Sequence, residues 1–310
     1  MPGPAQTIRA PTLRCAWCAL ELGESRQRLG GRSRCPACGV ATTDPWPTEG
    51  ELDASYSGSY RPHSGRFSGP GDLILRRTRG RLARRIDALA PPGPVLDVGS
   101  GDGALLDALA RAGREGMGLE RESQRADVIA ADVEDHEGSY AAVVMWHSLE
   151  HLRRPGEALA HVAGLLVPGG LLVPGGLLVV ALPNADSVQA QVFGERWLAL
   201  DLPRHLVHVG ADSLLDRLRE LGLRIERVSH VRGGQVLFGW LHGIVSAVLG
   251  GADLYDAIRR PEARTQALSS RRRAAVLATA VLVLPAAGIA ALGEIALRRG
   301  GTVYVEARRA

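Results

Sequence analysis

The sequence predicts an α/β fold in which a small N-terminal metal-binding module precedes an open, mainly parallel sheet. Three observations support this prediction. Four cysteines lie in two close pairs within residues 15–38, a glycine-rich turn joins a strand pattern to a helix pattern at 95–109, and short apolar segments alternate with helical patterns along the chain. A length of 310 residues accommodates one large domain and a small appendage.

The charge of the chain gives no sign of a polyanionic partner. The formal net charge is +4, and the basic residues, all of them arginine, are scattered over the whole sequence. We interpret them as solvated surface and expect no specific nucleic-acid partner. The opening MPGPAQTIRAPTLRC lacks the apolar region of a signal peptide, so a cytoplasmic location is expected.

The four cysteines have the spacing of a structural zinc site. Cys15, Cys18, Cys35 and Cys38 form a C-x2-C-x16-C-x2-C pattern, in which each pair places two thiolates on one tight turn. Because four sulfurs leave no open position on the metal, the zinc is expected to stabilise folding and to take no part in catalysis.

The chain is divided as follows. We predict a zinc-ribbon-like module at 1–45, a linker with a lid at 46–72, where Pro, Gly, Ser and Asp are frequent, and the main domain at 73–310. The main domain opens with a predicted helix at 72–90 that ends at a proline-rich turn.

A glycine-rich turn then connects the first strand to a helix. The strand at 95–98 leads into Gly99-Ser100-Gly101-Asp102-Gly103, and a helix begins at Ala104. This strand, turn and helix are typical of Rossmann-like cofactor sites. The spacing differs from the dinucleotide-binding G-x-G-x-x-G, because no glycine follows Gly103 at the required position.

The D-V-G-S-G-D-G stretch resembles motif I of class I S-adenosylmethionine-dependent methyltransferases, and the resemblance extends over about residues 50–310. It implies a Rossmann-like sheet of seven strands with the last strand antiparallel. It also implies that Gly99, Gly101 and Gly103 let the backbone approach the methionine part of the cofactor, and that Asp97 organises the loop beneath its amino group.

Two further acids fall at cofactor positions. The second strand, 116–120, ends in Glu120, where a carboxylate can accept both ribose hydroxyls. The third strand, 127–133, contains Asp132, which matches the position near the adenine amino group in the family; its alternative role is that of a cap or turn residue. The short spacing between Glu120 and Asp127 excludes a full crossover helix, so a shortened connection is expected.

The fourth strand, 140–146, leads into a segment with two histidines. Residues 145–152 read MWHSLEHL, close to the WHVLEHL stretch of a bacterial methyltransferase group often assigned to sugar and natural-product O-methylation. His147 and His151 are the candidate bases, with Glu150 as an orienter; a purely structural role for His151 is the alternative. Ubiquinone-pathway O-methyltransferases carry a similar acid–histidine pair linked to a divalent metal, but one pair without further carboxylates gives only weak support for a second metal here.

A second segment, FGERWLALDLPRHLVHV at 193–209, resembles the W-x-x-L-D-x-P-R-H-L-x-H segment of the same group. The resemblance assigns it to the acceptor side, where a polar cluster could bind hydroxyls or a phosphate. The candidate residues are Trp197, Asp201, Arg204, His205 and His208. The alternative is an Asp201–Arg204 ion pair that only fixes the loop.

A six-residue repeat, GLLVPG, at 164–169 and 170–175 is interpreted as a duplication that forms an extra loop or hairpin before the fifth strand, 177–182. A helix at 211–222 and a sixth strand at 223–231 follow, and the seventh strand covers 302–307.

An apolar helical insertion is predicted at about 235–297, with stretches at 236–249 and 274–292. The second stretch is long enough to span a bilayer, but Pro285 interrupts it and a strand follows. We interpret both as helices that cover the sheet edge or touch a membrane surface.

Together these features predict transfer of a methyl group from S-adenosylmethionine to a hydroxyl oxygen of a small-molecule acceptor, such as a sugar, a glycan precursor or a natural product. One alternative is sugar C-methylation, because some deoxysugar C-methyltransferases also carry an N-terminal zinc module. The other is a non-catalytic zinc-ribbon protein that binds nucleic acid and has a degenerate methyltransferase body.

Overall fold

A mixed sheet of seven strands forms the centre of the molecule in the computed structural model, with the order β10-β11-β8-β7-β4-β5-β6. The structure describes residues 13–23, 26–56, 67, 71–170, 174–231, 234–264 and 267–310. The strands are β4 (Val95–Val98), β5 (Gly116–Glu120), β6 (Val128–Ala130), β7 (Ala142–Trp146), β8 (Leu177–Pro183), β10 (Leu223–Ser229) and β11 (Thr302–Arg309). Strand β11 runs antiparallel to both of its neighbours, which confirms the predicted seven-stranded α/β sheet.

The central strands are buried on both faces because their sequences are almost entirely apolar. Side chains alternate between the two faces: Leu96 and Val143 belong to one apolar cluster, and Val95 and Val144 belong to the other. The sheet therefore separates two cores.

Helices cover each face of this sheet. The helices α2 (Gly71–Leu89) and α3 (Ala104–Arg111) pack on one face. The helices α4 (Pro155–Leu165) and α6 (Ala211–Glu220) pack on the other. The connection from β5 to β6 contains no helix in residues 121–127, all of which the structure describes, as the short spacing predicted.

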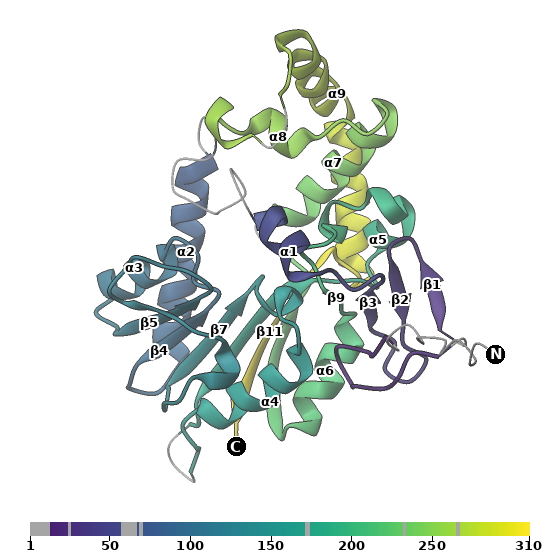
Figure 1. Ribbon diagram of the computed structural model, residues 1–310. Coiled ribbons are helices and arrows are strands. Elements are labelled where there is room, and N and C mark those ends of the chain that lie inside the picture. The colour runs from purple at the N-terminus through teal and green to yellow at the C-terminus, as the bar shows by residue number, and fades with distance from the viewer. Residues whose placement is uncertain are drawn as a thin grey trace, which may run out of the picture.

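Four strands form a second, smaller sheet that joins the N-terminal module to the main domain. The strands are β1 (Gln27–Leu29), β2 (Arg32–Arg34), β3 (Ala41–Thr43) and β9 (Val207–His208), in that order. Strand β3 pairs antiparallel with β9, and the Thr43 hydroxyl donates a hydrogen bond to the carbonyl of His205 at 2.8 Å. The module thus lies against the predicted acceptor segment, to the right of the main sheet in Figure 1.

The predicted linker at 46–72 contains one helix, α1 (Glu49–Tyr56), while residues 57–66 and 68–70 lie outside the described residues.

Short 3-10 turns follow several strands and helices. They are η2 (Val133–Asp135), η3 (Leu149–His151), η4 (Gly194–Arg196), η5 (Leu198–Leu200) and η6 (Pro261–Ala263). In the repeat, residues 167–170 and 174–175 belong to no helix or strand, and 171–173 lie outside the described residues.

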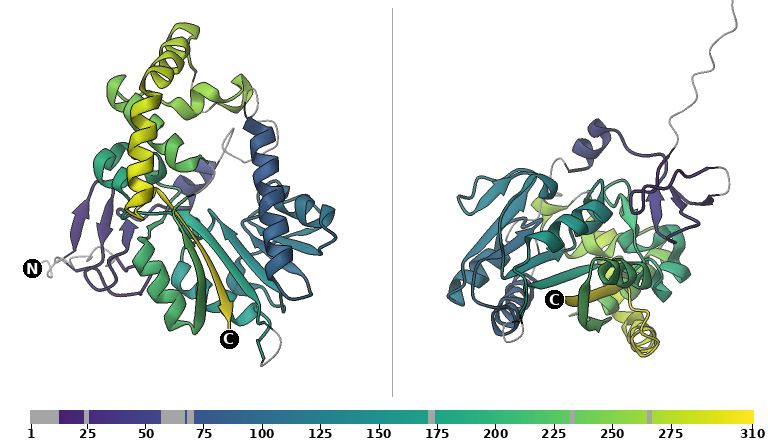
Figure 2. Two further views of the ribbon diagram at one scale, coloured as in Figure 1. Left: turned by 180° about the vertical axis from the view of Figure 1, so that it is seen from behind. Right: turned by 90° about the horizontal axis from the view of Figure 1, so that it is seen from below.

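The apolar insertion folds into helices that gather at the top of Figure 1. They are α7 (Gln235–Val248), α8 (Leu254–Ile258) and α9 (Ser270–Ala296), and α5 (Val188–Phe193) lies beneath α7. Helix α9 buries Val276, Ala287 and Ala291 against α7 and the neighbouring helices and leaves its other side open to solvent, on the outside of the molecule (Figure 2). Within the described residues, α9 is the one helix whose length and composition suffice to cross a membrane.

Candidate functional site

A cavity of about 600 Å³ opens at the carboxyl ends of β4, β5 and β7, the edge at which open α/β sheets bind ligands. It brings together most of the predicted cofactor residues and both predicted bases. Its lining includes Gly99, Gly101, Glu120, Asp132, His147 and His151, and helix α1 contributes Asp53 and Tyr56. The volume lies in the range of pockets that bind small molecules and cofactors.

The glycine turn after β4 has a conformation that side chains would oppose. Gly99, Gly101 and Gly103 have φ of +76°, +57° and +75°, in the left-handed region that favours glycine. A Cβ on Gly99 would lie 2.5 Å from the Cβ of Ser148, so the turn approaches the histidine segment closely. Gly103 packs against Arg125 and does not line the cavity, and its contact with a cofactor stays a prediction.

The Glu120 carboxylate is held at the cavity wall by backbone groups. Its Oε2 accepts a hydrogen bond from the N–H of Gly101 at 2.8 Å, and its Oε1 accepts one from the N–H of Arg121 at 3.0 Å. A carboxylate fixed in this way is preorganised to accept hydrogen bonds from a diol.

The two aspartates occupy different environments. Asp97 is buried within β4 directly before the glycine turn and does not line the cavity. Burial raises its pKa to about 7, with a further contribution from Glu120 and Asp102, while Arg79 opposes the shift. Asp132 is exposed at the cavity, and its side chain makes no capping hydrogen bond to η2.

His147 is the residue that turns the chain out of β7. Its φ of +53° is unusual for a residue with a side chain, and its N–H donates to the carbonyl of Ala181 at 2.7 Å. Its Nδ1 donates to Oε1 of Glu150 at 3.2 Å, and its Nε2 accepts from Nε2 of Gln235 at 3.2 Å. In the neutral ring Nε2 is therefore the proton-accepting nitrogen, and the Gln235 amide is its hydrogen-bond donor in this structure.

Glu150 is buried and His151 is half-buried beside the cavity. The Nδ1 of His151 lies 3.0 Å from the carbonyl oxygen of Arg204 and 2.9 Å from the hydroxyl of Tyr56. Burial lowers the pKa of His151 to about 4, and the neighbouring His205 adds to the shift. Burial opposes ionisation of Glu150, but the hydrogen bond from His147 and the nearby imidazoles bring its pKa below the usual value.

The predicted acceptor segment contacts this site through Arg204 and His205. Asp201 and Arg204 form an ion pair, in which Nε of Arg204 donates to Asp201 at 3.0 Å, and Nη1 of Arg204 donates to the carbonyl of Ser55 at 3.2 Å. The His205 ring centroid lies 4.7 Å from that of His151. The buried Nε2 of His208 has no hydrogen-bond partner among the described residues.

Trp197 lies apart from these groups, packed in an apolar cluster with Ala190 and Leu200. Trp197 and Asp201 line a separate hollow of about 620 Å³. The ion pair that was the structural alternative is therefore present, and the acceptor-binding role of the segment stays a prediction.

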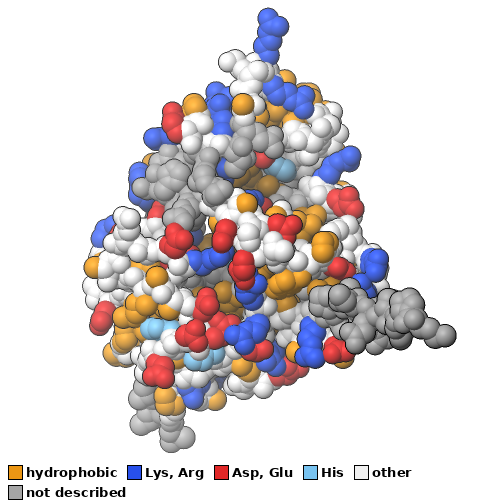
Figure 3. All heavy atoms as spheres, viewed as in Figure 1, with side chains coloured by type: hydrophobic (Ala, Val, Ile, Leu, Met, Phe, Trp, Pro, Cys, Tyr) orange, Lys and Arg blue, Asp and Glu red, His pale blue; other side chains and the backbone are white. Residues whose placement is uncertain are grey.

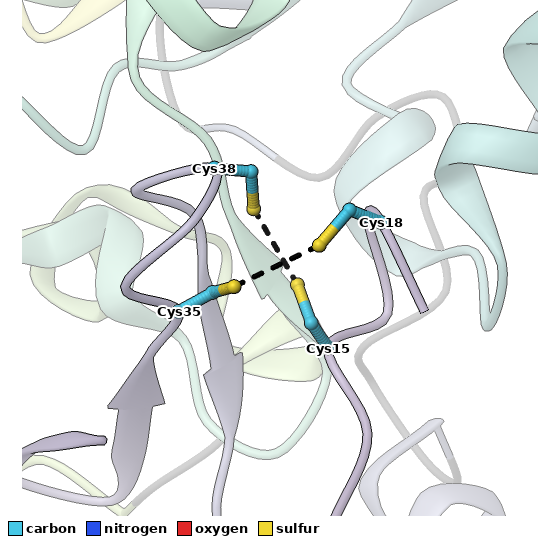
Figure 4. A group of neighbouring side chains, drawn as sticks. All are labelled: Cys15, Cys18, Cys35 and Cys38. Carbon is cyan, nitrogen blue, oxygen red and sulfur yellow. Dashed lines mark hydrogen bonds between the residues drawn. The ribbon is translucent and has the colours of Figure 1, made fainter. Parts of the chain in front are cut away.

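The four cysteines converge on one point, as Figure 4 shows. The Sγ atoms of Cys15 and Cys38 lie 3.6 Å apart, and those of Cys18 and Cys35 lie 3.7 Å apart. A tetrahedral zinc ion with Zn–S bonds of about 2.3 Å separates its sulfurs by about 3.8 Å. The donor set and its geometry therefore fit zinc, and the sulfurs are too far apart for disulfides.

Two residues that the sequence did not single out also belong to the site. Tyr56 lies in the predicted lid but carried no signal of its own, and it contacts His151. Gln235 begins α7, 88 positions after His147, and nothing in the local sequence indicates their contact.

A family model described as a methyltransferase domain matches residues 74–228, which is half of the chain. The chain belongs to this methyltransferase family. The match includes the glycine turn, Glu120 and both histidines of the cavity, together with the acceptor segment.

Solved structures resemble this methyltransferase at low identity. The [4+2]-cyclase SpnF is 19% identical with a TM-score of 0.45, over 83% of this chain and 90% of that one. A SAM-dependent methyltransferase from Archaeoglobus fulgidus is 18% identical with a TM-score of 0.45, over 76% and 94%. Magnesium protoporphyrin IX methyltransferase from Synechocystis PCC 6803 is 14% identical with a TM-score of 0.41, over 77% and 85%. No curated protein matches the sequence.

The cavity of the methyltransferase fits an S-adenosylmethionine molecule. The glycine turn has no side chains that would keep a ligand from the backbone at Gly99 and Gly101, and Glu120 offers a fixed carboxylate on the same wall. When bound, this cofactor supplies an electrophilic methyl group on a sulfonium.

Proposed function

We propose that the enzyme transfers the methyl group of S-adenosylmethionine to a hydroxyl oxygen of a sugar or another small natural-product acceptor. The observation that supports this most is that one cavity holds both the Glu120–glycine-turn wall and the two histidines. Positioning of the acceptor oxygen in line with the methyl group is the main requirement of such a transfer. The acceptor must also lose its proton.

We assign the cofactor roles by position. Glu120 would accept hydrogen bonds from the ribose hydroxyls, and Asp132 would lie near the adenine amino group. The backbone at Gly99, Gly101 and Gly103 would approach the methionine part, with Asp97 beneath the turn.

His147 suits the role of general base better than His151. Its Nε2 is the proton-accepting nitrogen, while its Nδ1–H is oriented by Glu150. Burial lowers the pKa of His151 to about 4, so its imidazole takes up a proton less readily.

The acceptor would approach from the side of the 193–209 segment. Arg204 connects that segment to α1 through Ser55, and His205 contacts His151. Trp197, Asp201, His205 and His208 would shape this side, with the Asp201–Arg204 pair holding the loop. On the face shown in Figure 3, acidic and basic side chains are interspersed, so a nucleic-acid partner is not proposed.

The four cysteines would bind one structural zinc ion. The module is small and has few buried apolar side chains of its own, and a metal supplies folding energy to domains of this size.

We further propose a cytoplasmic enzyme that touches an anionic membrane surface through α9. Between Arg273 and Arg298 the exposed face of the helix carries no charge, and Val281, Leu282 and Ile289 are each more than 70% exposed. Arginines at both ends of the helix suit the phosphate level of a lipid surface.

The test of the methyltransferase proposal is calorimetric titration of the purified protein with S-adenosylmethionine and, separately, with NAD. We expect binding of S-adenosylmethionine alone, weakened in Glu120→Ala, followed by methyl transfer in a screen of sugar acceptors. Binding of neither compound would contradict the proposal and point to a non-catalytic body.

A further inference from the structure

Three side chains outside the zinc module form a second group with the donor set of a metal site. Glu150, His151 and His205 each offer one ligand atom, and these atoms lie within 4.8 Å of one another. They come from two segments, η3 after β7 and the loop before β9. A backbone hydrogen bond of 2.8 Å from the N–H of Leu206 to the carbonyl of Glu150 joins these segments.

Both imidazoles are oriented as metal-binding histidines are. Nδ1 of His151 donates to the Arg204 carbonyl at 3.0 Å, and Nδ1 of His205 donates to the Ala199 carbonyl at 2.8 Å. Because a carbonyl can only accept, each neutral ring keeps its proton on Nδ1 and its lone pair on Nε2. A backbone carbonyl bound to the other ring nitrogen is the usual support of a ligating histidine.

The carboxylate of Glu150 has an oxygen that nothing else in the described chain uses. The side chain is 2% exposed, Oε1 accepts from His147, and the buried Oε2 has no hydrogen-bond partner among the described residues. A buried carboxylate oxygen without a partner is costly, and a cation would remove that cost. Asp201 also lies near the histidines: its Oδ2 is 3.7 Å from Nε2 of His205, and it pairs with Arg204.

We propose that Glu150, His151 and His205 bind a divalent transition-metal ion, separate from the ion held by the four cysteines. Two imidazole nitrogens and one carboxylate oxygen suit ions such as zinc, cobalt or iron(II) better than magnesium or calcium, which prefer oxygen ligands. Three protein ligands leave a coordination position open, unlike the closed four-cysteine site.

The position of this site gives the ion a role that rests on the proposed methyl transfer. His151 lines the cavity together with His147 and Glu120. An acceptor hydroxyl bound at the open position would lose its proton more readily, since a divalent cation stabilises the alkoxide. His147 would then take that proton through Nε2.

The test is titration with cobalt(II) chloride of protein that carries one equivalent of zinc by metal analysis, followed by visible absorption and calorimetry. Zinc already fills the four-cysteine site. We therefore expect the Glu150–His151–His205 site to bind one equivalent of cobalt, with the weak absorption bands of nitrogen and oxygen ligands and no thiolate charge-transfer band. His205→Gln and Glu150→Gln should each weaken this binding by at least about tenfold.

The matched control is His161→Gln, which replaces a histidine of α4 whose Nε2 contacts the carbonyl of His136 and lies outside the cluster. It should bind cobalt as the wild-type protein does. If the wild-type protein binds no cobalt in addition to its one zinc ion, the proposal is overturned, whether or not a variant folds. A folded His205→Gln protein with unchanged affinity would also overturn it. These outcomes are independent of methyl transfer, because no S-adenosylmethionine is present.

Discussion

The carboxylate of Glu120, at the end of β5, accepts a hydrogen bond of 2.8 Å from the backbone N–H of Gly101, in the turn after the neighbouring strand β4. This bond ties the two strand ends together at the cavity. The same carboxylate is therefore both a support of the glycine turn and the proposed ribose ligand.

Replacing Glu120 with alanine should weaken S-adenosylmethionine binding by at least about tenfold, or ~1.4 kcal/mol, because both roles are lost. Calorimetry measures the affinity, and circular dichroism checks that the fold remains. The control is Glu137→Ala, in an exposed loop outside the cavity. An affinity that Glu120→Ala leaves unchanged would remove Glu120 from the cofactor site.

Replacing Asp97 with asparagine should stabilise the protein at high pH. Since burial raises the pKa of Asp97 to about 7, above the usual 3.8, the folded protein holds a proton here that the unfolded chain has released. Wild-type stability therefore falls as the pH rises between these two values and stays low above them.

The stabilising effect of Asp97→Asn should thus grow by about 2 kcal/mol between about pH 5.5 and about pH 8. Urea unfolding of both proteins at each pH measures it. At about pH 8, where the wild-type carboxyl is ionised, the variant should also bind S-adenosylmethionine more weakly, because it cannot place a negative charge beneath the glycine turn. An effect on stability that is the same at both pH values would show that Asp97 is not the titrating group.

Removing zinc should destabilise the module and loosen the acceptor segment. We expect Cys35→Ser or a chelator to lower the Tm by at least about 3 °C, the shift that roughly 2 kcal/mol produces in a protein of this size. Hydrogen exchange should rise at β9, which pairs with β3, and stay low in the internal control α2. Unchanged hydrogen exchange at β9 after zinc loss would show that the zinc module does not stabilise the acceptor segment.

The apolar face of α9 predicts binding to anionic vesicles. The double substitution of Leu282 and Ile289 by serine should reduce sedimentation with phosphatidylglycerol vesicles several-fold, and wild-type protein should bind phosphatidylcholine vesicles less. Ile129→Ser removes an exposed apolar side chain at the far edge strand β6 and serves as the control. Equal sedimentation of all three proteins would argue against a membrane role for this face.

The elements with strong local patterns could be predicted from the sequence. The apolar runs of β4, β7 and β8 and the glycine turn determine the sheet, and the cysteine spacing indicated the four-thiol cluster that the structure contains. Strand β6 is shorter than predicted, at Val128–Ala130, because the chain turns into η2 directly after it.

The remaining features depend on contacts between distant segments. His205 meets Glu150 and His151 only because β9 pairs with β3 and Leu206 bonds to η3, and a two-residue strand has no sequence pattern of its own. For the same reason the sequence showed one acid–histidine pair and not a set of three donors. The position of Trp197 in an apolar cluster was equally hidden.

The pairing of β3 with β9 also limits how this protein can be cut and recombined. A gene fragment that begins at residue 46 would encode a chain with an unpaired edge at β9 and an exposed backbone beside His205. The cysteine-rich segment therefore completes a sheet of the main domain, and moving it onto another enzyme would require a free edge strand in that enzyme.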